Sequence, residues 1–450
     1  METPRLEEVR LTSFKSFTDQ RLPLQDLTVL IGRNGSGKSN SLDALMVLSR
    51  LALGEPVRDA LDGPRSGGEE PIRGGADGCA PLGENHFALG CRVRSGDAVF
   101  DLDVEIEVAP EVRILREELT AVEGVPYGGR RLAAGRSLLA SDPVDPRRSD
   151  LNVRYFNGRR GLDPGVPFSA DRLLTSQVPV RLPATTEATK LVHRAAQDVL
   201  AVLRDVFLLD PVPHLMRQYV NARDTELRRS ADNLSAAVAG LKQADPAAFG
   251  RLTELVAGMP EYPVRGVSSV GTKLGDVQLV LREGGYHGAE HDVPARLLSD
   301  GMLRFLAFGT SLLSAPVSDG GDDAGDGPPR AQRHLVIEEI ENGLYPTQAA
   351  RVLRLMKEES QRRRIDVLFT THSPALLNSL TAQDHSGVVV CSRDPESGES
   401  LLTPLTELPG YVDLLAAGDL GDAVTKGRLP DAVRPRDTDV TGVEDFLRSL

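Results

Sequence analysis

The residues from Gly32 to Ser39 read Gly-Arg-Asn-Gly-Ser-Gly-Lys-Ser and fit the pattern G-x-x-x-x-G-K-[ST] of a phosphate-binding loop. In such a loop, glycines let successive backbone N–H groups curl around a β-phosphate at a helix N-terminus, where the helix dipole favours negative charge. Lys38 is then placed to reach the β- and γ-phosphates, and the Ser39 hydroxyl to ligate Mg²⁺. This predicts a nucleoside triphosphate site formed by Gly32, Asn34, Gly35, Ser36, Gly37, Lys38, Ser39 and Asn40.

Two adjacent carboxylates follow another apolar run. Residues 335–337 (Leu-Val-Ile) lead into Glu338 and Glu339, which is the Walker B arrangement. In this arrangement the first acid holds the Mg²⁺ shell, and the second polarises the attacking water as the catalytic base. Two acids after a strand are weak support alone, because a strand that runs into a capped turn looks the same. The residues that follow, 340–346 (Ile-Glu-Asn-Gly-Leu-Tyr-Pro), sharpen the prediction.

A histidine ends a third apolar run. Residues 365–370 are predicted to be a buried strand, and Thr371-His372-Ser373-Pro374 follows it. A lone histidine is usually structural, but ligands bind at the carboxyl ends of strands in open α/β sheets. We therefore predict that His372 lies beside the strand that bears Glu338 and Glu339, and that it hydrogen-bonds a γ-phosphate or the catalytic water.

The elements around the phosphate loop suit this chemistry. Residues 27–31 (Leu-Thr-Val-Leu-Ile) are predicted to be a buried strand, and residues 41–48 have helical spacing. Strands near 334–337, 365–370 and 388–391, with a helix between each pair, predict a parallel α/β sheet. Further expected elements are a strand at 6–14, antiparallel strands near 86–94, 98–108 and 111–122, helices from 187 to about 256, and an apolar helix that follows 297–301 and ends before residue 316.

The composition bounds the class of protein. A length of 450 residues allows two or three domains. The net charge of −13 argues against a protein that coats nucleic acid through its overall charge, so any DNA contact must come from a local patch. No stretch approaches the roughly 18 apolar residues of a membrane span, and no signal segment is visible at the N-terminus. The three cysteines lack metal-ligand spacing and are interpreted as buried or incidental thiols. We expect a cytoplasmic protein with no membrane contact.

Four of these motifs occur in an order that a known family uses. Residues 32–39, 298–304, 336–346 and 370–374 resemble the motifs of ABC-type ATPases of the SMC/RecF/OLD group, in particular the stand-alone "AAA family ATPase" proteins. The segment Phe14-Lys15-Ser16-Phe17 is also similar to the start of those proteins. The resemblance implies an α/β P-loop NTPase of ABC/SMC-head type, with an antiparallel β subdomain and a helical insertion. It also implies ATP and Mg²⁺ as ligands and ATP hydrolysis as the reaction.

The resemblance further implies that two copies form an ATP-sandwich dimer. The signature residues of one subunit would then meet the γ-phosphate held by the other subunit; they are Ser299, Asp300 and Gly301. A serine hydroxyl and a helix N-terminus aimed at an anion suit this role. Asp300 stands where transporter-type members have glycine, and it adds negative charge near the nucleotide. The Q-loop glutamine of the family cannot be placed, and its candidates are Gln177, Gln197 and Gln218.

An arginine-rich segment is the candidate DNA contact. One interpretation is a patch that contacts the phosphate backbone. The other is a solvated variable loop, since three aspartates accompany the arginines. The arginines are Arg130, Arg131, Arg136, Arg147, Arg148, Arg154, Arg159 and Arg160.

The expected organisation has four parts. They are an N-terminal ATPase lobe with the phosphate loop and the β subdomain (1–185), a helical insertion (186–262), a C-terminal ATPase lobe (263–416) and a tail (417–450). Fewer than eighty residues follow His372, too few for the nuclease (Toprim) domain of OLD-type proteins, so any nuclease is expected to be a separate chain. Asp437 and Asp439 in the tail are interpreted as a chance pair.

Two functional hypotheses follow. The leading one is an ATPase that dimerises on ATP and acts on DNA or on a DNA-acting partner, in repair or anti-phage defence. The alternative is a nucleotide-gated protein-interaction module with slow hydrolysis and no DNA contact. The arginine-rich segment favours the first hypothesis, whereas the net charge and the lack of a nuclease domain favour the second.

Overall fold

A sheet of 14 strands runs through the part of the chain that the computed structural model describes, which is residues 3–63, 70–144, 150–258, 264–284, 290–315, 332–342, 346–416 and 418–433. Its strands are β1 (Arg5–Phe14), β2 (Phe17–Pro23), β3 (Leu27–Ile31), β4 (His86–Ser95), β5 (Ala98–Glu107), β6 (Arg113–Glu123), β9 (Arg136–Ser141), β10 (Asp150–Tyr155), β11 (Gly165–Ser169), β12 (Val206–Leu209), β17 (Arg333–Ile337), β18 (Ile365–Thr370), β19 (Val388–Arg393) and β20 (Ser400–Pro404). They lie in the order β11-β10-β9-β6-β5-β4-β1-β2-β20-β19-β3-β18-β17-β12.

Five neighbouring strands, β19, β3, β18, β17 and β12, pair in parallel, which confirms the predicted parallel core. These strands are short apolar runs, as expected where helices cover both faces of a sheet. The sequence predicted helices from residue 187 to about 256, broken only at Pro211, Pro213 and Pro246, and β12 corrects this expectation. Its four residues, Val-Phe-Leu-Leu, are too few to show a period, and only their pairing with the distant β17 makes them a strand.

The other part of the large sheet is antiparallel. β4, β5 and β6 occupy the three predicted strand positions and pair with one another as a meander. β9, β10 and β11 extend this meander through a region whose sequence shows little periodicity. The predicted antiparallel β subdomain is therefore present, and it contains more strands than the sequence indicated.

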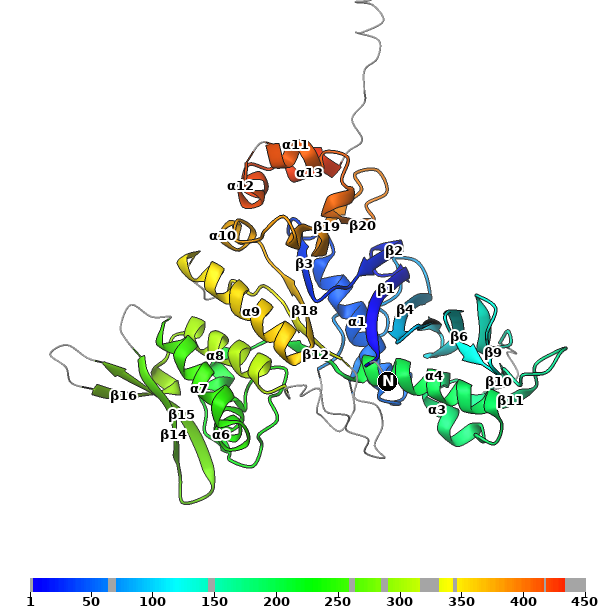
Figure 1. Cartoon of the computed structure of the whole chain (residues 1–450), viewed down its shortest axis with the longest axis horizontal. Helices are drawn as coiled ribbons and strands as arrows, with labels where there is room; N and C mark the ends of the chain where they lie inside the picture. The colour runs from blue at the N-terminus through cyan, green and yellow to red at the C-terminus, as the bar shows by residue number, and fades with distance from the viewer. Residues whose placement is uncertain are drawn as a thin grey trace, which may run out of the picture.

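Helices cover the sheet on two faces and create two hydrophobic cores (Figure 1). Leu30 of β3 packs into the core that includes α1, whereas its neighbours Val29 and Ile31 pack into the core that includes α8. On the first side lie α1 (Lys38–Ala52), α2 (Val57–Asp62), α3 (Leu174–Arg181) and α4 (Glu187–Arg204). On the second lie α5 (Pro213–Met216), α6 (Leu234–Ala244), α7 (Pro246–Ala257), α8 (Asp300–Leu313), α9 (Ala349–Arg363), α10 (Pro374–Leu377), α11 (Tyr411–Ala416), α12 (Leu420–Thr425) and α13 (Leu429–Val433).

A second, smaller sheet packs against α6 and α7 on the α8 side of the molecule. Its strands are β13 (Val220–Asn221), β14 (Val264–Gly271), β15 (Asp276–Gly284) and β16 (Glu290–Pro294), and a separate hairpin contains β7 (Pro126–Tyr127) and β8 (Arg130–Arg131). β13 pairs with β15, so this sheet joins residues on both sides of the expected boundary at residue 262.

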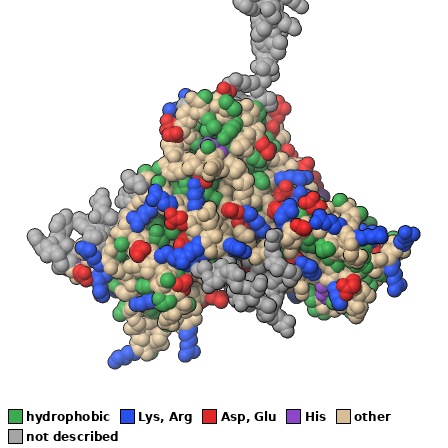
Figure 2. All heavy atoms as spheres, in the orientation of Figure 1, with side chains coloured by type: hydrophobic (Ala, Val, Ile, Leu, Met, Phe, Trp, Pro, Cys, Tyr) green, Lys and Arg blue, Asp and Glu red, His purple; other side chains and the backbone are tan. Residues whose placement is uncertain are grey.

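Acidic and basic side chains are intermixed over the face of the molecule that Figure 2 shows. None of the helices in the described residues is long and apolar enough to cross a membrane. The three cysteines are buried and unpaired, as expected, and burial raises the pKa of the Cys79 and Cys91 thiols to about 12.

Candidate nucleotide-binding and hydrolysis site

The phosphate loop connects the end of β3 to the start of α1, as the sequence predicts. Gly32 has φ 153°, and a Cβ there would lie 2.1 Å from the carbonyl oxygen of Cys391, so no side chain fits. Gly37, with φ 116°, is the N-cap of α1 and makes no side-chain cap. The helix therefore begins with uncapped N–H groups and no acidic residue in its first turn, which is the arrangement that binds an anion.

Lys38 is buried, and no carboxylate among the described residues is bonded to it. Its Nζ donates to the carbonyl oxygens of Gly32 (2.8 Å) and Arg33 (3.1 Å) across the loop. Burial lowers the pKa of Lys38, while the nearby Glu339, Glu341 and Glu338 oppose that shift. A buried ammonium bonded to carbonyl groups is poorly compensated, so an anion at this position would be stabilised.

The ends of three neighbouring strands bring the acidic pair and the histidine to the phosphate loop. β18 lies between β3 and β17, with Thr370 opposite Leu30 and Phe369 opposite Ile337. The sequence predicted that His372 and the acidic pair would follow adjacent strands, and this arrangement is confirmed.

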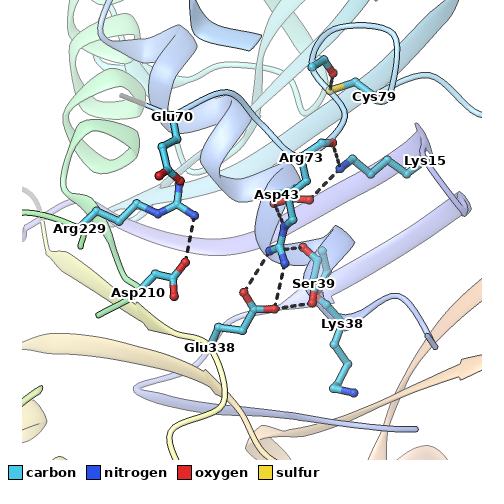
Figure 3. Close-up of polar contacts among 12 residues, drawn as sticks. Lys15, Lys38, Ser39, Asp43, Glu70, Arg73, Cys79, Asp210, Arg229 and Glu338 are labelled. Carbon is cyan, nitrogen blue, oxygen red and sulfur yellow. Dashed lines mark hydrogen bonds and ion pairs between the residues drawn. The ribbon is translucent and has the colours of Figure 1, made fainter. Parts of the chain in front are cut away.

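Glu338 is bonded directly to the phosphate-loop helix. Ser39 Oγ donates to Glu338 Oε1, so the two predicted metal ligands lie side by side (Figure 3). Burial opposes ionisation of Glu338, but hydrogen bonds from Ser39 and Arg73 outweigh it and hold its pKa below the ordinary value. The hydroxyl and the ionised carboxylate supply hard oxygen ligands, which suit Mg²⁺. Across the described residues, no group of three or more His, Cys, Asp or Glu side chains is arranged to hold a metal ion.

Arg73 is a site residue that the sequence interpretation missed. Its guanidinium donates to both carboxylate oxygens of Glu338 (3.2 and 3.1 Å) and to Asp43 Oδ1 (3.1 Å). Lys15 completes this network by donating to Asp43 Oδ2 (2.7 Å) and to the carbonyl of Arg73 (2.8 Å). Figure 3 shows the network beside the first turn of α1. Arg73 lies in a stretch rich in glycine and proline, and the following Gly74-Gly75 is the only local signal of a constrained turn.

Glu339 has a left-handed backbone, with φ 50°. Its N–H donates to Thr370 Oγ1 (2.8 Å), and its Oε2 accepts from Asn342 Nδ2 (2.8 Å). A non-glycine residue in this conformation costs roughly 1–3 kcal/mol and persists where the surroundings over-determine it. The strained turn directs Glu338 and Glu339 to different partners.

His372 carries a buried nitrogen that lacks a partner. Its Nε2 has no hydrogen bond to any described residue, whereas its backbone N–H donates to Glu341 Oε1. Burial, with the charge of Lys38, lowers the pKa of His372 and favours a neutral ring. An unpaired buried ring nitrogen close to a lysine is suited to a phosphate oxygen or a water.

The remaining predicted loop residues differ in where they point. Asn34 and Gly35 are exposed, whereas Ser36 is buried with an unpartnered Oγ among the described residues. Asn40 Nδ2 donates to Ser16 Oγ (3.0 Å), so its side chain is directed toward the β1–β2 turn.

The signature residues lie apart from the phosphate loop. Ser299 is the N-cap of α8, and its Oγ accepts from the N–H of Met302 (3.2 Å). Asp300 pairs with Arg217 (2.6 Å). In the described parts of the chain, no hydrogen bond or ion pair joins Ser299, Asp300 or Gly301 to the phosphate loop.

None of the candidate Q-loop glutamines reaches this site within the described residues. Gln177 bonds the backbone of Ser169 and the carbonyl of Arg172, and so supports the start of α3. Gln197 and Gln218 are exposed.

The arginine-rich segment is partly used for structure. Arg136 pairs with Asp163 (2.5 Å), Arg154 with Asp142 (2.6 Å) and the exposed Arg131 with Asp97 (2.9 Å). Arg147, Arg148, Asp437 and Asp439 lie outside the described residues. The exposed arginines that remain are Arg130, Arg159 and Arg160.

Two protein-family models match the chain. One, described as "AAA ATPase domain", matches residues 5–61, which hold the phosphate loop. The other, described as "AAA domain, putative AbiEii toxin, Type IV TA system", matches residues 182–378, which hold the signature, the acidic pair and His372. The DNA replication and repair protein RecF of Arthrobacter sp. (strain FB24) is 28% identical over 317 residues, which is 62% of this chain and 75% of that protein. The chain is therefore similar to P-loop ATPases of the AAA and RecF type. The predicted family resemblance and fold class are confirmed.

Structures of SMC head domains align with most of this chain, but the sequence identities and TM-scores are low. The SMC head domain from Thermotoga maritima has a TM-score of 0.39 and 15% identity, and covers 89% of this chain and 98% of that one. The Smc head with an extended coiled coil, bound to the C-terminal domain of ScpA derived from Pyrococcus furiosus, has a TM-score of 0.44 and 12% identity, and covers 92% and 99%.

Proposed function

We propose that this protein binds ATP with Mg²⁺, hydrolyses it within a dimer of two copies, and thereby acts on DNA or on a DNA-acting partner. The contact between Ser39 and Glu338 carries this proposal, because it joins the phosphate-loop helix to the strand end that presents Glu339. The family matches support ATP as the nucleotide.

In this proposal, each residue of the site has its own role in ATP binding or hydrolysis. Lys38 exchanges its two carbonyl partners for phosphate oxygens, and His372 Nε2 contacts the γ-phosphate or the attacking water. Glu339 orients that water and accepts its proton. Ser39 and Glu338 would hold the metal ion, which supplies charge neutralisation at the phosphates. Ser299 would complete the site from the second copy; in the described residues of its own chain it caps α8 and makes no hydrogen bond to the phosphate loop.

The proposed action on DNA rests on the similarity to RecF and on the exposed arginines Arg130, Arg159 and Arg160. One matching family model is described as "AAA domain, putative AbiEii toxin, Type IV TA system", and we take this description as the reason to propose defence beside repair. The net charge of −13 and the internal pairing of Arg136 and Arg154 support the alternative, a nucleotide-gated interaction module without DNA contact.

The decisive test of hydrolysis is Glu339→Gln. The variant should bind ATP within about threefold of the wild-type affinity, because no phosphate-loop residue changes. Its turnover should fall at least about a hundredfold, since a positioned base contributes about that much. With ATP it should accumulate as a dimer in analytical ultracentrifugation. The matched control is Glu111→Gln, an exposed glutamate in the turn before β6, which should hydrolyse ATP like the wild type. If the Glu339→Gln variant hydrolyses ATP at the wild-type rate, another group must be the catalytic base.

DNA contact is tested separately by measuring ATPase rate with and without duplex DNA over a salt series. If duplex DNA stimulates the ATPase rate and this stimulation declines as the salt concentration increases, the proposed DNA contact is supported, because contacts with DNA phosphates release counterions. An unchanged rate at every salt concentration would favour the interaction module.

A further inference from the structure

Asp300 of the signature forms an ion pair with an arginine that follows a different helix, α5. Arg217, the residue after α5, donates from Nη2 to Asp300 Oδ1 (2.6 Å) and to the carbonyl oxygen of Leu298 (2.9 Å). The carbonyl of Arg217 in turn accepts from Nε2 of Gln278, a buried residue of β15 (2.8 Å). Arg217 is therefore held at its backbone by the second sheet and spans the start of α8 with its side chain.

The charge of Asp300 is favourable in the isolated chain and unfavourable in the proposed dimer. In the isolated chain, a carboxylate in the first turn of α8 interacts favourably with the helix dipole. In the proposed dimer, the same carboxylate would approach the negatively charged triphosphate of the other copy, and like charges in proximity repel. A cation must therefore accompany Asp300 for the signature to approach ATP.

We propose that Arg217 is a positioning residue for the signature, which neutralises Asp300 and orients the Leu298–Ser299 backbone so that a second copy carrying ATP can dock. This inference rests on the proposed ATP-dependent dimer. Arg217 acts through Asp300 and Ser299.

Exposed apolar side chains around this ion pair support a docking surface for a second copy. Leu215 and Tyr219 flank Arg217 in sequence and are 39% and 48% exposed, and Leu297, adjacent to Leu298, is 69% exposed. Large apolar side chains grouped at one place on a surface favour association. Their burial would lower the local dielectric, so both the repulsion from Asp300 and its neutralisation by Arg217 would become stronger on docking.

The test is a charge cycle measured by ATP-dependent dimerisation in analytical ultracentrifugation, with ATP binding to the monomer measured in parallel. Arg217→Ala should bind ATP within about twofold of wild type. It should dimerise about tenfold or more weakly, as expected when one member is removed from a charge pair that becomes buried on docking. Asp300→Asn alone should dimerise at least as well as wild type. The double variant Arg217→Ala/Asp300→Asn should regain most of the lost dimerisation, and Arg217→Lys should regain part of it.

Rescue by Asp300→Asn separates charge neutralisation from a general packing role, which the second substitution would not repair. The matched control is Arg116→Ala, which removes an arginine from an exposed Arg–Glu pair on β6, at the other side of the molecule (Figure 1). It should dimerise like wild type. If Arg217→Ala dimerises normally, or Asp300→Asn fails to rescue it, the assignment of Arg217 is wrong while the dimer stands. If wild type and Glu339→Gln both stay monomeric with ATP, the proposed dimer fails and this inference fails with it.

Discussion

Two adjacent glutamates in this site have distinct surroundings. Glu338 is bonded to Ser39 and Arg73, and these hydrogen bonds favour its ionised form. Glu339 turns away through a left-handed backbone and is held by Thr370 and Asn342. One turn thus gives the two carboxylates different partners, which suits the proposed division between a metal ligand and a catalytic base.

Arg73 gives a prediction about the metal. Its guanidinium is bonded to the carboxylate that would hold Mg²⁺, so the cation must compete with it. Arg73→Gln removes this competition, and ATP binding should reach half-saturation at an Mg²⁺ concentration about threefold lower, as expected for a partly exposed ion pair worth up to about 1 kcal/mol. The measurement is binding of a fluorescent ATP analogue across an Mg²⁺ titration. Arg116→Gln, which alters an exposed pair far from the site, should leave the titration unchanged. An unchanged or higher Mg²⁺ requirement in Arg73→Gln would contradict the prediction.

The residues of the phosphate loop, the acidic pair and His372 could be predicted because each follows an apolar strand and lies within a short local pattern. Arg73 could not, since its contact with Glu338 joins residues 265 positions apart and its own surroundings have no periodicity. The same reason applies to Arg217, which meets Asp300 only through the fold.

At the level of elements, β1 is tied to the core at the end of the sheet opposite the nucleotide site. The N–H of Leu6 donates to His334 Nε2 (3.4 Å), and Arg5 pairs with Asp366 (3.0 Å). His334 and Asp366 are both buried, and each is the second residue of its strand, β17 and β18 respectively. A neutral imidazole is therefore part of the attachment of the first strand.

His334 predicts a specific pH dependence of stability. Burial, with the charge of Arg5, lowers its pKa to about 3, so the folded protein favours the neutral ring. Its stabilising contribution is complete above the unfolded pKa of about 6.5 and is lost as pH falls toward 3. Burial raises the pKa of Asp366 to about 7, so the Asp366 contribution runs in the opposite direction and is lost as pH rises through 7.

The prediction isolates His334 by substitution. Between pH 6.5 and 5, the wild type should lose up to about 2 kcal/mol of unfolding free energy relative to His334→Gln, which lacks the titrating ring. Urea unfolding at pH 7, 6 and 5 measures this difference. His291→Gln, which alters an exposed histidine of β16, should keep the wild-type pH dependence. Parallel pH profiles for wild type and His334→Gln would show that His334 does not titrate in this range.

Elements with a clear period could be predicted from the sequence, and β12 and β13 could not. β4, β5 and β6 alternate over ten or eleven residues, which identifies them directly. β13 has two residues and β12 has four. Each is a strand only because it pairs with a strand that is distant in the sequence, β15 and β17 respectively. Short strands of this kind have no sequence signal of their own.

For the whole molecule, the position of α1 and α8 in different cores has a consequence for how a site can be completed. The phosphate loop begins the helix in one core, and the signature begins the helix in the other. The proposed composite site would combine the phosphate loop of one molecule with the signature of another, and this proposal can be tested by mixing.

Two inactive variants should restore activity when combined. Ser299→Arg should bind ATP but fail to dimerise or hydrolyse, because a bulky cation replaces the small donor. Lys38→Ala should lose ATP affinity, because the cation at the phosphates is gone. In a mixed dimer, one site carries both lesions and the other carries neither, so ATPase activity should partly return. Inactivity of a verified mixed dimer would mean that the signature does not act across the interface, or that both sites must act together.

The place of β3 in the sheet has a consequence for synthesis. β3 ends at residue 31, yet both of its neighbours, β18 and β19, come from beyond residue 364. At translation rates of roughly 5–20 residues per second, the ribosome needs from about 17 seconds to about a minute to deliver the first of these partners. Throughout that interval the strand that precedes the phosphate loop has unpaired edges on both sides. Its pairing therefore depends on segments that emerge only after residue 364, and the nascent chain would benefit from a chaperone that shields this strand until β18 arrives.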